Sequence, residues 1–269
     1  MFHYFPKRTS YNSKQIAAGI TAIGIIYFLM SDKAPFSNRR RLIIVPQSVE
    51  QYSGQTTYLN IMRENSSAIL HPNSPYHLKV KDIASKLLLS NKNLLPEVDW
   101  QVHVINSNEL NAFVLPNGKI FVFKGLFNLV SSDAELSAVI AHEIGHTVAR
   151  HSSETMSFMN ILTAATVFLG FHNIFRMVGI DDLLSSRYSR TLEYEADEIG
   201  LHLMSNACYN PNAAVRIWQK FDEIDHGHGN IEFLSTHPTH KNRQDRIKRI
   251  IPSLGDWKKK CSSKWWSYE

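Results

Sequence analysis

The sequence predicts an α+β fold in which helices dominate and a small antiparallel β-hairpin or sheet lies against them. Three observations carry this prediction. Apolar residues recur at spacings of three and four in several long segments, as in helices buried on one face. Residues 100–104 instead alternate apolar and polar side chains, as half-buried strands do. Finally, Asn117-Gly118 separates two β-branched and aromatic runs, which is typical of a hairpin turn because both residues tolerate positive φ.

Composition sets the scale of the molecule and excludes some functions. The chain has 269 residues, 43% hydrophobic and 20% charged, which is enough for one sizeable core or two small ones. The formal net charge of +5 comes mainly from scattered basic residues, so no basic stripe with stacking aromatics indicates nucleic-acid binding. Cys208 and Cys261 are too few for a disulfide scaffold or a Cys-based zinc site, and they are either free thiols or a single disulfide.

The N-terminus combines a basic leader without acidic residues and an apolar run from Ile16 to Met30. About 17 residues separate Lys14 from Asp32, near the lower limit for crossing a ~30 Å hydrocarbon core. A cleaved secretory signal would need an A-x-A-like site, and none follows; a buried helix would show a polar face, and the run has none. We therefore expect residues 1–31 to be a leader and an uncleaved membrane anchor. The leader also resembles a mitochondrial address, whereas the charge bias leaves orientation open.

The remaining elements follow from the same patterns. Residues 32–73 are basic and polar and are predicted to be a linker. A helix is expected from Ser74 to Leu89, and another from a capping box formed by Ser132 and Glu135. The expected strands are 100–104, 111–115 and 119–123, and further helices are expected at 189–206, 211–224 and 239–250. The main domain is therefore placed at 74–255, followed by a basic, aromatic tail at 256–269.

A second apolar stretch, Met156–Phe171, has two interpretations. It is a membrane-embedded segment, although Asn160 and its short length make a full span unsafe, or it is a lid or an interfacial hairpin leaning on a bilayer.

The chemistry of the chain is indicated by His142-Glu143-Ile144-Gly145-His146, an H-E-x-x-H motif within the helix that begins at Ser132. Residues four apart project from one helix face, so both imidazoles can reach one zinc ion at about 2.0–2.1 Å. Glu143 lies beside them and can take a proton from water activated by the metal. Gly145 lets another segment approach the helix closely, at a cost of about 1 kcal/mol in helix propensity. The motif predicts a zinc-dependent hydrolase.

A catalytic zinc needs a third protein ligand, and a later helical pattern offers one. Glu193 and Asp197 share a helix face, whereas Glu195 points away from it. Glu193 would bind the metal, and Asp197 would orient a metal-bound histidine. The spacing alone is equally typical of an acidic, solvated helix face.

These motifs together resemble the membrane metallopeptidase clan that contains bacterial HtpX and the type I CAAX prenyl proteases. The resemblance rests on the H-E-x-x-H motif and on four further segments in the same order, which cover roughly residues 75–250. They are Asn111-Ala112-Phe113 through Pro116-x-Gly118-x-Ile120-x-Val122-x-x-Gly125-Leu126, Ser189-Arg190, Glu193-x-x-Ala196-Asp197, and Ser235-Thr236-His237-Pro238 with Arg243.

Within that clan the chain is most similar to the mitochondrial inner-membrane endopeptidase family whose activity overlaps that of the matrix-facing AAA protease. The similar segments are Leu70–His77, Val98-Asp99-Trp100, Ala112–Leu115 and Glu193–Gly200. The chain is short, so the cleavable presequence usual in the family is abbreviated or missing.

The resemblance implies roles that spacing alone does not supply. It implies a gluzincin-type domain with one Zn²⁺ per subunit, in which Glu193 is the third ligand and His237 stabilises the oxyanion. It also implies that the strand 119–123 or its partner offers an edge to an extended peptide, with Asn111, Ala112 and Phe113 in substrate binding. The substrates would be proteins in or near the mitochondrial inner membrane, cleaved in quality control or stress-triggered processing, and the catalytic domain would face the intermembrane space.

Two alternatives stay open at this point. One is a bacterial-type membrane or periplasmic metallopeptidase of the same clan. The other is a catalytically silent, zinc-binding, chaperone-like protein, although a structural zinc site has no need of a base such as Glu143. The expected partners are protein substrates and the lipid bilayer but no nucleic acid, and homo-oligomerisation is left open.

Overall fold

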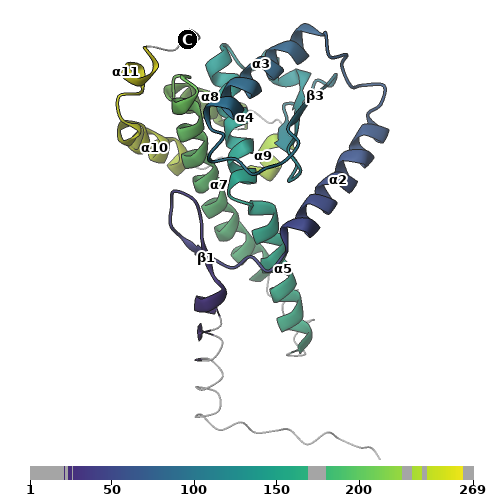
Figure 1. Ribbon diagram of the computed structural model, residues 1–269, viewed down its shortest axis with the longest axis vertical. Coiled ribbons are helices and arrows are strands. Elements are labelled where there is room, and N and C mark those ends of the chain that lie inside the picture. Colours follow the sequence, from purple (N-terminus) through teal and green to yellow (C-terminus); the bar gives the residue numbers. More distant parts are fainter. Residues whose placement is uncertain are drawn as a thin grey trace, which may run out of the picture.

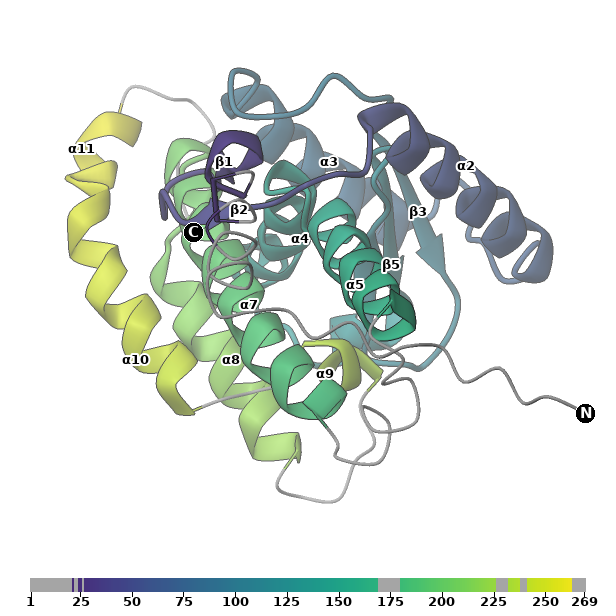
Figure 2. The ribbon, with the colours of Figure 1, turned by 90° about the horizontal axis from the view of Figure 1, so that it is seen from below.

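The computed structural model describes residues 27–168, 180–225, 232–237 and 241–262, together with Thr21, Gly24 and Ile25. Helices dominate this part of the chain, and a small sheet packs beside them, so the α+β class is confirmed. Two helices, α4 (Asp133–Val148) and α7 (Ile180–Asn206), lie side by side at the centre of the body (Figure 1). The helices α3 (Pro75–Ser90), α8 (Asn212–Asp225) and α10 (Lys241–Ile250) surround this pair, and α2 (Gln47–Glu64) lies on the side opposite α10 (Figure 2).

The remaining elements complete the order. They are β1 (Asp32–Lys33), β2 (Arg40–Arg41), β3 (Gln101–Ile105), β4 (Ala112–Val114), β5 (Lys119–Phe123), the 3-10 helix η1 (Lys124–Asn128), α5 (His151–Phe168), α9 (Glu232–Thr236), the 3-10 helix η2 (Ile251–Leu254) and α11 (Trp257–Cys261).

The predicted hairpin is present, but the sheet that contains it is mixed rather than antiparallel. β4 pairs antiparallel with β5 across the turn at Gly118, whose φ is 85°. β3 pairs with the other side of β5 in parallel, so the strand order is β3-β5-β4. The sequence predicts that 119–123 or its partner forms the free edge. β5 is the central strand and pairs on both sides, so it offers no free edge. β3 and β4 are the edge strands, and an isolated bridge from Ile69 to Ile105 covers part of β3.

The pairing of α4 and α7 depends on two glycines. A Cβ at Gly145 would lie only 2.8 Å from the Ala196 carbonyl oxygen, and a Cβ at Gly200 would lie 3.1 Å from the His142 backbone nitrogen. The two backbones therefore approach more closely than any larger residue allows. α4 begins at the predicted Ser132, whose hydroxyl accepts from the Glu135 backbone N–H at 3.2 Å. Almost every residue of α4 is buried, so this helix is the core of the molecule.

The segment predicted to be a linker, 32–73, is ordered. It contains β1, β2 and the 18-residue helix α2, and Arg41 within it is only 4% exposed. The basic residues that make this stretch look like a solvated linker are partly buried in ion pairs with the main domain, which composition alone does not reveal.

Among the described residues, no helix is both long and apolar enough to cross a membrane. Most of the apolar run from Ile16 to Met30 lies outside the described residues, so the anchor stays a prediction. α5 covers the second apolar stretch as far as Phe168, and it exposes Met156, Met159 and Ile161.

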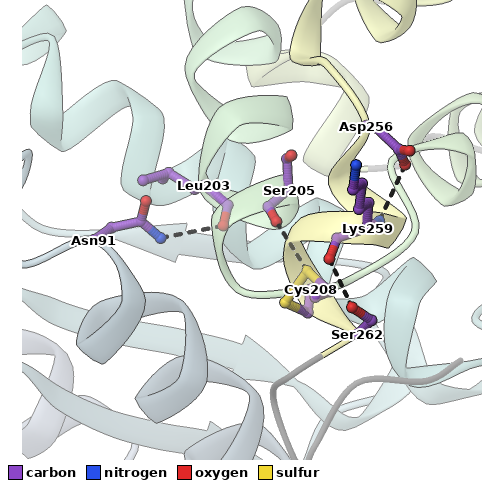
Figure 3. Close-up of a disulfide and its surroundings, with 8 residues drawn as sticks. Asn91, Leu203, Ser205, Cys208, Asp256, Lys259 and Ser262 are labelled. Atoms are coloured by element: carbon purple, nitrogen blue, oxygen red, sulfur yellow. Dashed lines mark hydrogen bonds between the residues drawn. A yellow bond between two sulfur atoms is a disulfide. The ribbon is translucent and has the colours of Figure 1, made fainter.

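The two cysteines, left open by the sequence, form one disulfide that ties the end of α7 to α11 (Figure 3). Their Cα atoms are 5.6 Å apart. α11 itself begins at Asp256, whose carboxylate accepts from the Lys259 backbone N–H at 3.0 Å. The C-terminal helix is thus fixed to the central helix pair by a covalent bond, although 53 residues separate the cysteines in sequence.

Candidate metal centre

The two histidines of the H-E-x-x-H motif project from one face of α4, as the four-residue spacing predicts. Their Nε2 atoms lie 3.1 Å apart. His142 is 1% exposed, whereas the His146 side chain is 18% exposed and borders a cavity. The buried helix thus fixes the backbone of both residues, and one of them faces the space that a substrate would enter.

Glu193 of α7 faces these two nitrogens across the helix pair. Its carboxylate oxygens lie 3.2 Å from His142 Nε2 and 3.3 Å from His146 Nε2. Ligand atoms at the corners of a tetrahedron about 2.0–2.1 Å from a zinc ion lie roughly 3.3 Å apart. The three side chains therefore have the donor types and the separations that a tetrahedral metal site requires.

His237, which follows α9, joins the same group of side chains. Its Nδ1 lies 3.0 Å from a Glu193 oxygen and 3.4 Å from His142 Nε2, and its Nε2 lies 3.4 Å from Glu143. One nitrogen thus faces the metal-binding atoms and the other faces the predicted base. The rest of this segment, with Pro238 and His240, lies outside the described residues, as do His226 and His228.

Asp197 lies behind His142, on the side away from the other donors. Its Oδ1 is 3.0 Å from His142 Nδ1. Arg243 of α10 donates two hydrogen bonds of 2.9 Å to the Asp197 carboxylate and also lies 3.1 Å from Glu193. The guanidinium packs over the Trp218 ring, 4.2 Å from its centroid. Asp197 therefore contacts the ring nitrogen of His142 that points away from the other donors, and the arginine that binds Asp197 comes from a helix distant in the sequence.

The charges at this site match a divalent cation. Glu143, Glu193 and Asp197 are buried carboxylates. Among the described residues, Arg243 is the one guanidinium that contacts or neighbours these three groups. Two negative charges therefore lack a partner when all three carboxyls are ionised, and buried charges need compensation.

The pKa values at the site show how the metal-free protein compensates. Burial, reinforced by Glu193, raises the pKa of Glu143 to about 8. Burial lowers the pKa of His142, but Asp197 and Glu193 outweigh it and raise that pKa to about 9. Glu143 Oε1 is also buried without a hydrogen-bonding partner in the described part of the chain. The site thus holds protons where a cation would sit, and the residues present fit a metal ion.

A cavity of about 560 Å³ opens beside these residues. It is lined by catalytic-motif residues, by α5, by α7 and by β4: Val114, Glu143, His146, His151, Ser152, Thr155, Phe158, Met159, Ser189, Leu192, Glu193, Thr236 and His237. Of the residues predicted to bind substrate, Ala112 is buried and Phe113 stacks on Phe121 with ring centroids 5.0 Å apart. The Asn111 carbonyl accepts from the Phe123 N–H at 3.0 Å. Val114, next along β4, is the strand residue that reaches the cavity.

A second His/Glu cluster, which the sequence does not predict, lies directly behind His146. His151, at the start of α5, places its Nδ1 2.8 Å from His146 Nδ1 and its Nε2 3.3 Å from a Glu195 oxygen. Arg39 donates to Glu195 at 2.8 and 2.9 Å and to Glu154 at 2.7 and 2.9 Å. Glu195 does point away from Glu193, as expected, but it is 3% exposed rather than solvated.

Comparison with known proteins gives consistent results. The family model described as peptidase family M48 matches residues 76–251. The mitochondrial metalloendopeptidase OMA1 of Saccharomyces cerevisiae is 33% identical over 90% of this chain and 75% of its own length. The human metalloendopeptidase OMA1 is 30% identical over 93% of this chain, which spans only 52% of that protein. The metalloprotease YcaL of Escherichia coli is 26% identical over 71% of this chain.

Proposed function

The chain belongs to peptidase family M48, and we propose that it is a zinc-dependent endopeptidase that cleaves proteins in or near the mitochondrial inner membrane. Cleavage would serve quality control or stress-triggered processing. The observation that carries this proposal is the convergence of His142, His146 and Glu193 on one point, beside the buried carboxyl of Glu143 and a cavity of about 560 Å³.

The roles of the residues follow from their positions. His142, His146 and Glu193 would hold the metal. When bound, zinc supplies a Lewis acid for the scissile carbonyl and lowers the pKa of water to about 7. Glu143 takes the proton of the attacking water and returns it to the leaving amine. His237 lies beside the base, with its Nε2 3.4 Å from Glu143, and would stabilise the oxyanion.

Substrate binding would use the free edge of β4. An extended peptide that adds to this edge pairs through its backbone, and the residues 111–113 then supply main-chain groups rather than side-chain pockets. Recognition of this kind depends little on the substrate's sequence. Access to the site therefore decides which proteins are cleaved.

The location of the protein is proposed from several features. The two OMA1 relatives named above are mitochondrial proteins, and the basic leader and apolar run precede the domain. The exposed Met156, Met159 and Ile161 on α5, of which Met159 also borders the cavity, suit a surface close to a bilayer. The disulfide favours an oxidising compartment, which supports a catalytic domain in the intermembrane space. The bacterial-type alternative is less well supported, because the chain is less similar in sequence to the bacterial YcaL than to the OMA1 proteins.

The test of this function is Glu143→Gln in the purified chain. The amide keeps the shape of the side chain but cannot accept the proton, so casein cleavage should fall by roughly 10²–10⁴-fold. Zinc content, measured by mass spectrometry, should stay at one ion per chain. Full cleavage by this variant would contradict the mechanism, and zinc binding without cleavage by the unaltered chain would favour the chaperone-like alternative. Proteomics of cleaved membrane proteins with the same pair of proteins would then identify the substrates.

A further inference from the structure

The N-terminal arm, defined here as residues 32–45, is attached to the catalytic domain by specific contacts. Phe36 stacks on His202 of α7 with ring centroids 4.4 Å apart, and the Ser37 hydroxyl donates to Glu195 at 2.6 Å. The Ile44 N–H donates to Ser157 of α5 at 2.9 Å. In Figure 1 the arm lies beside the lower part of α7. It thus contacts both helices that flank the cavity.

The turn of the arm has an unusual backbone that these contacts maintain. Phe36 and Asn38 have φ values of 62° and 53°, in the left-handed region that disfavours residues with a side chain. Such conformations persist only where the surroundings fix them. The strained turn presents Arg39, so the position of this guanidinium is determined by the fold.

From Arg39 a continuous line of contacts reaches the metal ligand His146. Arg39 donates to Glu195, the Glu195 carboxylate lies 3.3 Å from His151 Nε2, and His151 Nδ1 lies 2.8 Å from His146 Nδ1. Each side chain in this line is buried or partly buried, with exposed fractions of 26% for Arg39 and 3% for Glu195.

The chemistry of these groups fixes the direction of every hydrogen bond in the line. An ionised carboxylate only accepts, so His151 donates to Glu195 through Nε2 and keeps a lone pair on Nδ1. That lone pair accepts from His146, which therefore carries its proton on Nδ1. His146 Nε2 is then left with the lone pair that a metal needs, and it is the nitrogen that faces His142 and Glu193.

This second cluster is not itself a cation site, although His151, Glu154 and Glu195 lie close enough to hold one. Arg39 and Arg41 lie against its two carboxylates, so its charges are already balanced. The 2.8 Å separation of His151 Nδ1 and His146 Nδ1 requires a lone pair on one of these two nitrogens, so they do not both carry a proton. Because the charges of this cluster are already paired, it needs no cation of its own, and its contact with His146 is what links it to the metal centre.

We propose that the N-terminal arm helps to position a ligand of the metal centre. Through Glu195 and His151, Arg39 fixes the orientation and the tautomer of the metal ligand His146. His151, Glu195 and Arg39 are positioning residues, because none of them touches the reacting atoms. Since the arm follows the predicted anchor, movement that withdraws the arm from α7 also loosens a metal ligand. This inference rests on the proposed function, because it concerns the same metal.

The experiment measures metal binding rather than activity alone. The purified, metal-free chain is titrated with Zn²⁺ in competition with a chromophoric chelator. Loss of a group that orients a metal ligand typically weakens binding by about 10–100-fold. We expect this for His151→Phe, which removes the acceptor for His146, and at the lower end of the range for Arg39→Gln. The neighbouring Arg40→Gln is the matched control, because Arg40 stacks on Phe28 and donates to Ser31 instead, and its affinity should not change.

Two further measurements separate positioning from general stability. The visible absorption of bound Co²⁺ should change in Arg39→Gln but not in Arg40→Gln, because it reports ligand geometry. His151→Gln should recover part of the affinity that His151→Phe loses, since an amide both accepts and donates. Zn²⁺ affinities and Co²⁺ spectra that match the unaltered chain in both Arg39→Gln and His151→Phe would overturn the proposal, even if the variants melt earlier.

Two outcomes need separate interpretation: a variant that does not fold, and an unaltered chain that binds no zinc or cleaves no casein. If His151→Phe fails to fold, the pair Arg39→Gln and Arg40→Gln decides the question, because both side chains reach the solvent. If the unaltered chain itself binds no zinc or cleaves no casein, the proposed function fails instead. The inference alone fails when the unaltered chain does both and the arm variants bind metal equally well.

Discussion

The two histidines that α4 directs at the metal are supported from behind in different ways. His142 contacts the carboxylate of Asp197 directly, and Arg243 fixes that carboxylate from within the core, where the arginine side chain is 2% exposed. His146 reaches its carboxylate, Glu195, only through His151, and Arg39 fixes it from an arm on the surface. Both supports use an arginine and a carboxylate, and the longer one adds the imidazole of His151.

The difference lies in what each support depends on. The short support, Arg243–Asp197, is closed within the domain, so it forms whenever the helices pack. The long support, Arg39–Glu195–His151, exists only while the arm is attached to α7 and α5. His142 is therefore fixed by residues of the core, whereas His146 is fixed through the N-terminal arm, which contacts the domain at its surface. The two supports also differ in net charge. The charges around the long support are balanced, whereas the short support lies in a site with an excess of negative charge.

The largest expected effect comes from removing the arginine of each support in turn. Arg243→Met leaves buried Asp197 and Glu193 without their guanidinium, which should destabilise the metal-free chain by about 3–5 kcal/mol. Arg39→Met should cost less, because Arg39 is 26% exposed and Glu154 keeps its contact with Arg41. Urea unfolding of both variants measures the two values. Equal losses would mean that the two supports do not differ as their burial indicates.

A smaller effect is expected from widening the helix pair that both supports share. Gly145→Ala would place a Cβ 2.8 Å from the Ala196 backbone oxygen, so α4 and α7 must separate slightly. Overpacking of this kind typically costs about 1–3 kcal/mol. Zinc affinity should fall as well, since Glu193 lies on α7 and the histidines on α4. A variant with weaker stability but unchanged zinc affinity would show that the helix spacing does not set the ligand geometry.

The smallest effect is the pH dependence that the long support contributes. Burial would raise the pKa of Glu195, but hydrogen bonds from Arg39, His151 and Ser37 lower it to about 2. A carboxyl with a depressed folded-state pKa stabilises the fold above its unfolded pKa of about 4.3 and loses this contribution as pH falls toward 2. The stability difference between the unaltered chain and Arg39→Gln should therefore shrink from pH 5 to pH 3. Urea midpoints at those pH values check this, and a constant difference would argue against it.

Much of the site could be predicted because it depends on local geometry. His142 and His146 share a helix face, and so do Glu193 and Asp197, because the helical repeat places residues four apart on one side. The Asn117-Gly118 hairpin and the Ser132 cap likewise depend on a few neighbouring residues, and both are present. The family resemblance extended this reading to His237, which the structure places beside the same donors.

The sequence by itself therefore predicted the metal-binding residues and the base Glu143, and it determined the class of fold. Only the tertiary structure decided that β5 is central and β4 an edge, that the two cysteines are joined, and that the supposed linker carries Arg39 to Glu195. The physical reason is that these features join segments far apart in the chain, where no periodicity relates one residue to the other. A basic residue in a polar stretch has the same local pattern whether solvent or a buried carboxylate becomes its partner, and packing alone distinguishes the two.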